Sequence, residues 1–463
     1  MRVARDGSRR ALATNSTPAT LQISTLKEEP NGRKDIRADS PCQIAAVRSI
    51  SPKCFAGWRC HTRFDCGFRS RSVARRQPRH QNRPHQPEDR SNGRFRGSAR
   101  LDARRRSQSA RARASDRWQN LQVEFIAKDS QTDESRTAEL ANELILKDKV
   151  DIITASAGSI NCNPTANVAE LNEVPCITTN NPWESYYYGR NPPKEGFTYT
   201  YHFFWGLKEI LACFIGLWKD QDTNKVVGTL FNTAQDDNDW HNAFIPAIKA
   251  AGFTVVDPGQ FPAFGNDFTP QVTAFKKAGV QIVSGNLFTP DFAGFYNQCA
   301  QMGYQPKIIT LGKAFLFPSD VAALGPRGVG VTSEVWWTPD HPFKSSLTGI
   351  SSKDLGATYE KATGKHWTQP IPYVHALCEV VVDVLKRSKD PKDPKSILEA
   401  ITTTDVHTIV GHVKWTGQPV KNVCVTPVVA GQWQKHGDRL DIAIVNSGDF
   451  PEIKTTSKLL PLA

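Results

Sequence analysis

From Leu121 onward the chain alternates short β-branched runs with longer segments of helical periodicity, and this alternation constrains the fold more than any other sequence feature. The runs Val123–Ala127 and Val150–Thr154 have the composition of strands, and Ser135–Lys149 between them carries apolar residues at helical spacing. Parallel strands need crossover helices of this kind, so we expect an α/β protein with helices flanking parallel sheets. The length of this body suits two domains.

The alternation falls into two series. The first ends with a strand at Pro175–Thr179, and the second begins after the aromatic stretch Thr198–Gly206. Four strand–helix units in succession predict a doubly wound domain of its own. Its strands are expected at Lys225–Phe231, Phe253–Asp257, Gln281–Leu287 and Lys307–Lys313. Because the first series is too short for a complete domain, we expect later helices to return to it, giving two lobes joined by several crossings.

Residues 1–118 differ in composition from the rest. They hold 25 Arg and 3 Lys against 10 acidic residues, a formal charge of +18, whereas residues 119–463 carry −6. We expect this segment to be disordered, and three interpretations remain open. It is a basic arm that binds nucleic acid, a zinc module around Cys54, Cys60 and Cys66, whose spacing matches no common finger, or a segment translated out of frame.

The sequence contains no recognisable targeting segment. Arg9-Arg10 is not followed by an apolar core with a cleavage site, and no stretch of about 20 apolar residues occurs. As written, the chain is therefore expected to remain in the cytoplasm.

Small polar residues follow several predicted strands. Ser156 and Ser159 follow one strand, and Thr178 and Thr179 end another. In open α/β sheets ligands bind at the carboxyl ends of strands, where backbone N–H groups and short hydroxyls suit a small carboxylate. The alternative is that these residues only cap helices. Trp183, Trp205, Trp240, Trp336 and Trp337 lie in predicted loops or crossings, where they would either line a cleft or fill the core between the lobes.

Motifs of common enzymes are missing from the sequence. It has no phosphate-binding G-x-x-x-x-G-K-[ST] loop, no G-x-S-x-G elbow and no H-E-x-x-H pair. We therefore predict neither catalytic residues, nor a metal site, nor a cofactor. Cys162 and Cys176 flank a predicted short helix, and two possibilities stay open for them: a disulfide, which would imply an oxidising compartment, or two buried thiols.

Several segments of the body, in this order, resemble a known family. VEFIAKDSQTD, RTAELANELILKDKVDIITAS, NEVPCITTNNPWE, NKVVGTLFN and TAFKKAGVQIVSGNLFTPDFAGFYNQCAQMGYQPKIITLGK are similar to substrate-binding proteins of ABC importers, of the type that binds leucine and other branched-chain amino acids. The resemblance covers residues 121–463. It implies two Rossmann-like lobes that close on a ligand and three crossings, which we place at Thr198–Gly206, Trp336–Phe343 and Thr402–Gly411.

The resemblance also implies domain limits. We expect the first lobe at residues 119–204 and 341–402, the second at 205–340 and 403–450, and a tail at 451–463. Ser156, Ser159, Thr178 and Thr179 correspond to the positions that hold the ligand's carboxylate. The second lobe would close with Asp237, Trp240, Phe288 and Lys313. Amino-acid binders of this type carry an acid near the position of Lys313, so a lysine there favours an anionic ligand that lacks an α-amine.

The implied function is to capture a small amino acid or carboxylate and deliver it to an ABC permease, in the periplasm and without catalysis. The family's signal peptide, first strand and first pocket loop have no counterpart in residues 1–118, so we expect an exposed sheet edge and poor folding of the first lobe. The alternative function is a cytoplasmic ligand-sensing regulator on the same fold whose basic arm binds nucleic acid.

Overall fold

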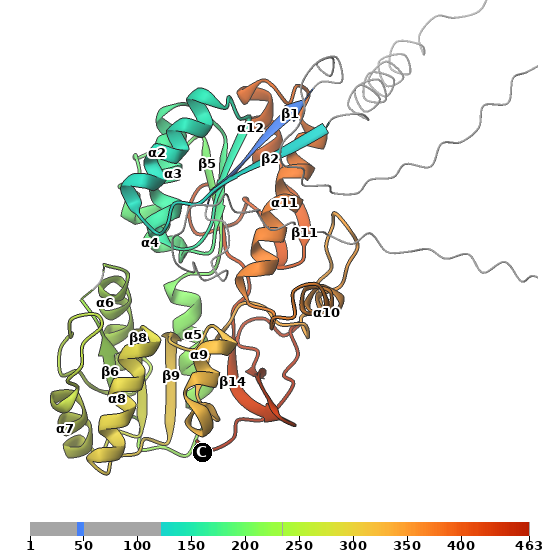
Figure 1. Cartoon of the computed structure of the whole chain (residues 1–463). Coiled ribbons are helices and arrows are strands. Elements are labelled where there is room, and N and C mark those ends of the chain that lie inside the picture. Colours follow the sequence, from blue (N-terminus) through green and yellow to red (C-terminus); the bar gives the residue numbers. More distant parts are fainter. Residues whose placement is uncertain (1–43, 51–121, 234, 463) are drawn as a thin grey trace, which may run out of the picture.

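The computed structural model describes residues 44–50, 122–233 and 235–462, and it contains two mixed sheets, each covered by helices (Figure 1). The first sheet has the strand order β13-β5-β4-β3-β1-β2, and the second has the order β15-β14-β10-β9-β8-β6-β7. A third, two-stranded sheet pairs β11 with β12. The expected α/β architecture with two lobes is confirmed.

The first sheet is built mainly from the first series. Its parallel core is β3, β4, β5 and β13. Successive residues of a strand point to opposite faces, and β3, β4 and β5 are buried along their whole length, so both faces of this core are covered. Ile152 of β3 belongs to the same buried cluster as residues of helix α11, whereas Ile153 belongs to the cluster that includes residues of α2 and α3. The elements of this part are β2 (Gln122–Lys128), α2 (Glu134–Asn142), the π-helix η2 (Glu143–Lys147), β3 (Ile152–Ala155), α3 (Ser159–Leu171), β4 (Cys176–Thr179), α4 (Trp183–Tyr187), the 3-10 helix η3 (Tyr188–Arg190) and β5 (Thr200–Phe203).

One strand of the first sheet comes from the segment that we expected to be disordered. Strand β1 (Ile44–Ile50) lies between β2 and β3 and is antiparallel to both, with Ala46 opposite Ile126 on one side and Ile153 on the other. Ala46 is fully buried. The expectation that nothing in residues 1–118 supplies a strand is therefore wrong at Ile44–Ile50, where a short run without proline matches the pleat of its neighbours. The remainder of residues 1–118 lies outside the described residues.

The second sheet contains the four predicted strand–helix units. Trp218 of α5 donates a hydrogen bond from Nε1 to Thr310 of β9 at 2.9 Å, and Phe275 of α7 packs against β6. The elements are α5 (Leu207–Lys219), β6 (Val226–Phe231), α6 (Gln235–Ala250), β7 (Thr254–Val256), α7 (Thr269–Ala278), β8 (Ile282–Leu287), α8 (Thr289–Gln301), β9 (Ile308–Lys313), α9 (Pro318–Ala323), the 3-10 helix η4 (Gly325–Gly328), β10 (Thr332–Val335), β14 (Val429–His436) and β15 (Arg439–Asn446).

The C-terminal part of the chain serves both lobes. Helix α11 packs on β4 of the first sheet, and β13 pairs with β5 there before β14 joins the second sheet. The third passage between the sheets therefore follows Cys424, later than the expected crossing at Thr402–Gly411. The elements are α10 (Ser352–Thr363), α11 (Pro370–Arg387), α12 (Pro394–Thr402), β11 (Asp405–Thr408), β12 (Gly411–Lys414) and β13 (Val423–Cys424).

The end of the chain is attached to the second sheet. The side-chain amide of Gln432 in β14 donates to the carbonyl oxygen of Leu460 at 2.7 Å, and that of Gln434 donates to the carbonyl oxygen of Lys458 at 2.8 Å.

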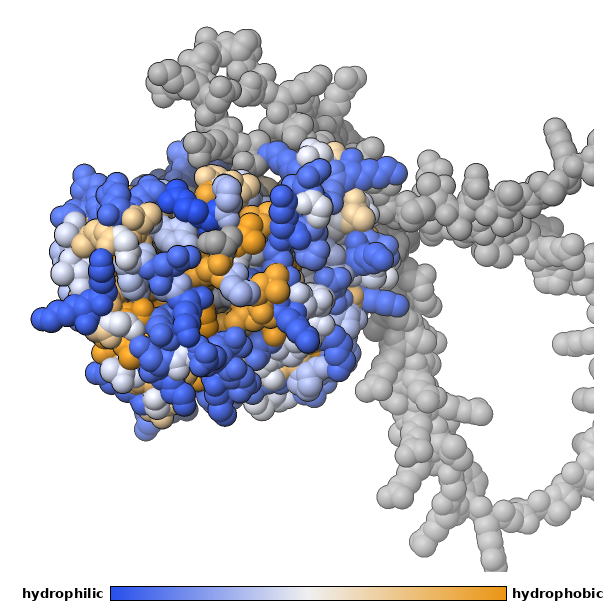
Figure 2. All heavy atoms as spheres, turned by 90° about the horizontal axis from the view of Figure 1, so that it is seen from below, coloured by the Kyte–Doolittle hydropathy of each residue, from blue (hydrophilic) through white to orange (hydrophobic). Residues whose placement is uncertain are grey.

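Seen from the end of the molecule that carries this sheet, the surface is mostly hydrophilic, with hydrophobic residues gathered near its centre (Figure 2).

Candidate ligand cleft

The course of the chain places the carboxyl ends of both parallel sheets opposite each other. Strand β5, parallel to β3 and β4, ends at Phe203 and leads through Phe204–Gly206 into α5 of the second lobe. Strand β10, parallel to β9, ends at Val335 and leads back toward α10 and α11. Because both strands reach a passage at their carboxyl ends, these ends of both sheets face the region between the lobes (Figure 1). A ligand is expected at this edge in open α/β sheets.

On the first lobe, two polar residues meet at this edge. Ser156 follows β3 and Asn180 follows β4, and the Asn180 amide donates to the Ser156 hydroxyl at 2.8 Å. Asn180 has a left-handed backbone (φ 61°), is buried, and its Oδ1 has no hydrogen-bond partner among the described residues. Ser159 is half-buried at the first position of α3, where backbone N–H groups are available to an anion. Ser156 and Asn180 thus form one polar pair, and the backbone N–H of Gly158, immediately before Ser159, donates to the carbonyl oxygen of Asn180 at 2.8 Å.

The two predicted threonines are engaged within the sheet. The Thr179 hydroxyl donates to the carbonyl oxygen of Phe203 at 2.6 Å, and the Thr178 hydroxyl lies 2.8 Å from Nδ1 of His202. Nε2 of His202 is 2.7 Å from the carbonyl oxygen of Asn181, so this nitrogen carries the proton and Nδ1 accepts from Thr178. Burial lowers the pKa of His202 to about 3, which keeps the imidazole neutral. In this conformation both threonines hold β4 to β5.

On the second lobe, three of the predicted residues form one cluster. Lys313, the last residue of β9, places its Nζ 3.1 Å from Oδ2 of Asp237 and 4.8 Å from the centre of the Phe288 ring. Asp237 is completely buried, whereas the Lys313 side chain is 25% exposed. Phe288 also stacks on Phe264, with ring centres 4.9 Å apart, and Phe264 is 68% exposed. The lysine and the two phenylalanines are therefore the groups that solvent or a ligand can reach.

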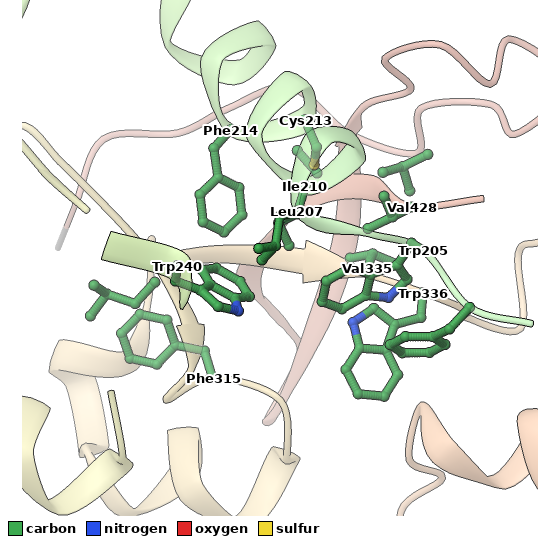
Figure 3. Packing of buried hydrophobic residues seen from close by; sticks show 14 of the residues in the cluster. Trp205, Leu207, Ile210, Cys213, Phe214, Trp240, Phe315, Val335, Trp336 and Val428 are labelled. Atoms are coloured by element: carbon green, nitrogen blue, oxygen red, sulfur yellow. The ribbon is translucent and has the colours of Figure 1, made fainter. Parts of the chain in front are cut away.

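Trp240, the fourth predicted residue of this lobe, belongs to the core. It is 3% exposed and stacks on Phe244 of the same helix at 4.7 Å. Trp205 and Trp336 lie on the first and second passages, with ring centres 5.8 Å apart, and Figure 3 shows them beside each other. Both are buried, and neither indole nitrogen has a hydrogen-bond partner among the described residues. These tryptophans fill the junction between the lobes.

The first passage is also held by two carboxylates. Glu184 of α4 accepts from the backbone N–H of Leu207 at 2.8 Å, and so caps α5 of the other lobe. Glu209 of α5 accepts from the backbone N–H of Gly206 at 2.9 Å. Burial raises the pKa of Glu184 to about 7, with a contribution from Glu209. A side chain at position 206 would lie 2.1 Å from Trp183, so the close approach of α4 to this passage requires glycine.

Two further polar residues near the second sheet's edge were not among the predicted site residues. Asn286 in β8 is 1% exposed, and its amide has no hydrogen-bond partner among the described residues. Glu334 in β10 is equally buried, and burial raises the pKa of its carboxyl group to about 7. The position of Asn286, next to last in a predicted strand, was visible in the sequence, but its burial without a partner depends on packing.

The cysteines of the body are free thiols. Cys162 and Cys176 are both buried and unbonded, so of the two possibilities the structure has the buried thiols. No helix within the described ranges is long and apolar enough to cross a membrane. The nucleic-acid alternative depends on residues 1–118, of which only β1 is described, and it stays a prediction.

Two helix-covered mixed sheets, joined by repeated passages and with the carboxyl ends of their parallel strands facing each other, define the class of two-lobed ligand-binding proteins. The model of the family described as periplasmic binding protein matches residues 108–438, and the chain belongs to this family. No curated protein sequence matches the chain.

Solved structures show the same fold. A leucine-binding protein, LivK, from Thermotoga maritima MSB8 aligns with a TM-score of 0.58 and 18% identity, over 69% of this chain and 87% of its own. An ABC-transporter solute-binding protein from Rhodopseudomonas palustris BisB5, in complex with 3,4-dihydroxybenzoic acid, aligns with a TM-score of 0.56 and 20% identity, over 70% and 87%. LivJ from Streptococcus pneumoniae str. Canada MDR_19A, in complex with isoleucine, aligns with a TM-score of 0.55 and 14% identity, over 69% and 86%.

Proposed function

We propose that the protein is the solute-binding component of an ABC importer and that it captures a small organic carboxylate between its lobes for delivery to a membrane permease. The observation that carries this proposal is the pair of facing edges, with the Ser156–Asn180 group on one lobe and Lys313 beside Phe288 on the other. A ligand that bridges both groups would stabilise the closed arrangement of the lobes over the open one. Periplasmic location follows from family membership as part of the same proposal.

The second lobe favours an anionic, planar ligand over an α-amino acid. Lys313 is the charged group that a ligand meets, because the carboxylate of Asp237 is buried behind it. An α-ammonium group beside Lys313 would be repelled, whereas a carboxylate or phenolate would be attracted. The exposed Phe264, which stacks on the half-buried Phe288, offers an aromatic ring to a planar ligand. Among the solved relatives, one carries 3,4-dihydroxybenzoic acid and another 4-hydroxybenzoate, which supports this ligand class.

Binding measurements on the full chain and one charge-reversal variant test the proposal. We expect calorimetry to detect 4-hydroxybenzoate and 3,4-dihydroxybenzoate in preference to leucine and isoleucine. Lys313→Glu should weaken binding of the aromatic acids by about tenfold or more, since a charged hydrogen bond contributes roughly 1.5–3 kcal/mol, and should shift the preference toward leucine.

Lys307→Glu provides the matched control. Lys307 immediately precedes the amino end of β9, whereas Lys313 lies at the carboxyl end of the same strand. It should leave binding unchanged. If the unmodified protein binds leucine more tightly than the aromatic acids, the anionic-ligand assignment is wrong. If it binds none of the solutes of either kind, the importer function itself loses its support.

A further inference from the structure

The hairpin β11–β12 carries two exposed histidines directly opposite each other. His407 pairs with His412 in the strand register, and Asp405 pairs with Lys414 one exposed position further along. The two imidazole rings are 4.3 Å apart at an interplanar angle of 18°. Residues on one face of an antiparallel pair at directly opposite positions have their Cβ atoms about 5 Å apart, so the register itself brings the rings together.

The hairpin is a rigid support for these rings. Its turn residues Ile409 and Val410 are buried, and the backbone N–H of Ile409 donates to Glu379 of helix α11 at 3.0 Å. Within the turn the Thr408 hydroxyl donates to the carbonyl oxygen of Gly411 at 2.8 Å. Ligand groups on fixed strands need little reorganisation when an ion binds, which favours affinity.

The surroundings also orient one ring. Oδ1 of Asp405 lies 2.6 Å from Nε2 of His412, so Nε2 is the nitrogen that donates to the carboxylate and Nδ1 is the nitrogen left for a metal ion. A histidine that donates one N–H to a carboxylate and binds a metal through its other nitrogen is a common arrangement in metal sites. Lys414 pairs with Asp405 at 2.7 Å and partly neutralises that carboxylate.

We propose that His407 and His412 together form a surface binding site for a divalent transition-metal ion such as Ni²⁺, Cu²⁺ or Zn²⁺. Imidazole nitrogens suit these ions, and two nitrogens bound at adjacent positions of one ion, each about 2.0–2.1 Å from it, lie about 3 Å apart, within reach of side chains at directly opposite positions of a hairpin. Because the two rings are stacked without a metal ion, both must turn about their Cβ–Cγ bonds before their lone pairs meet at the ion. Within the part of the chain that the structure describes, no three His, Cys, Asp or Glu side chains are arranged to hold a metal ion, so water completes the coordination.

Calorimetric titration of the full chain with NiCl₂ at pH 7.5 tests this site. We expect one Ni²⁺ site to be lost in the double variant His407→Asn/His412→Asn, and its affinity to fall on the order of 10²-fold in each single variant, because two-point attachment is removed. Asp405→Asn should weaken the site by about tenfold or more. The matched control is His436→Asn, which alters an exposed histidine at the end of β14 and should change nothing.

Equal Ni²⁺ stoichiometry and affinity in the unmodified protein and the double variant would overturn the proposal and assign any binding to other residues. A second measurement needs no substitution. Ni²⁺ should protect His407 and His412, but not His436, from carbethoxylation by diethyl pyrocarbonate, as read by peptide mass spectrometry. Modification of the pair at an unchanged rate would also refute the site.

Discussion

Replacing Glu184 by glutamine should change how the stability of the protein depends on pH. Burial raises the pKa of this carboxyl group from its ordinary value of 4.5 to about 7. Between these two values the folded protein retains a proton at Glu184 that the unfolded chain has released. The free energy of unfolding therefore falls as the pH rises through this window, and the contribution is fully lost above pH 7.

The size of the effect follows from the same two values. A pKa that rises from 4.5 in the unfolded chain to about 7 in the folded protein corresponds to a change of about 3 kcal/mol in the free energy of unfolding between pH 4.5 and pH 7. Glutamine keeps the shape and an acceptor oxygen for the N–H of Leu207 but cannot ionise. The stability of Glu184→Gln relative to the unmodified protein should therefore rise by up to about 3 kcal/mol from pH 4.5 to pH 8.

Urea denaturation of both proteins at pH 5, 6, 7 and 8 measures this difference. The comparison is made within each pH, so that other titrating groups, Glu334 among them, contribute equally to both proteins. Glu399→Gln serves as control, since Glu399 is an exposed residue whose carboxylate pairs with the exposed Lys389, and it should change stability by less than about 0.5 kcal/mol at every pH. A difference for Glu184→Gln that is constant with pH, or that falls as pH rises, would refute the argument.

Two further predictions concern packing and thiol reactivity. Gly285→Ala should destabilise the protein by at least about 3 kcal/mol, because a Cβ atom there would lie 1.8 Å from the carbonyl oxygen of Leu230. Gly216→Ala in α5 would place its Cβ atom at ordinary contact distances and should stabilise the protein by about 0.5–1 kcal/mol. Thermal unfolding of both variants measures the two changes in stability, and changes of the same sign and size would contradict the prediction. Burial raises the pKa of the Cys176 thiol to about 12, so Cys176→Ser should leave the number of thiols that react rapidly with a disulfide reagent unchanged in the native state and lower it by one in urea. A loss of one fast thiol in the native state would show that this cysteine is accessible.

The sequence predicts the regular elements of the body well, because strand and helix periodicities in residues 122–313 agree with the sheet that forms. It also places Lys313 at the end of a strand. The partner of that residue could not be predicted in the same way, because Asp237 is 76 positions earlier and meets Lys313 only when α6 packs on the sheet against β6 and β8. Likewise, the hydroxyl groups of Thr178 and Thr179 are chemically able to bind a carboxylate. In the folded protein, however, both form hydrogen bonds with residues of the neighbouring strand β5.

Two misplacements have a common physical cause. Strand β1 could not be predicted, because its seven residues lie in an arginine-rich segment and have no local feature that distinguishes them. The strand is stabilised by pairing with β2 on one side and β3 on the other. The third passage was placed too early because β13 is only two residues long, Val423–Cys424, and is defined by pairing with β5 alone. Short strands are fixed by their neighbours in space more than by their own sequence.

The position of β1 has a practical consequence for producing the protein in pieces. Among the strands that the structure describes, β2 is the outermost of its sheet and pairs with β1 alone, although residues 51–121 separate the two in the sequence. A fragment that starts at residue 121, where the sequence resemblance to the family begins, would lose β1, leave β2 without a strand to pair with and turn β3 into an unprotected edge. A fragment that starts a few residues before Ile44 would keep all three strands together. The choice of start site thus determines whether the first lobe is obtained with six strands or with four.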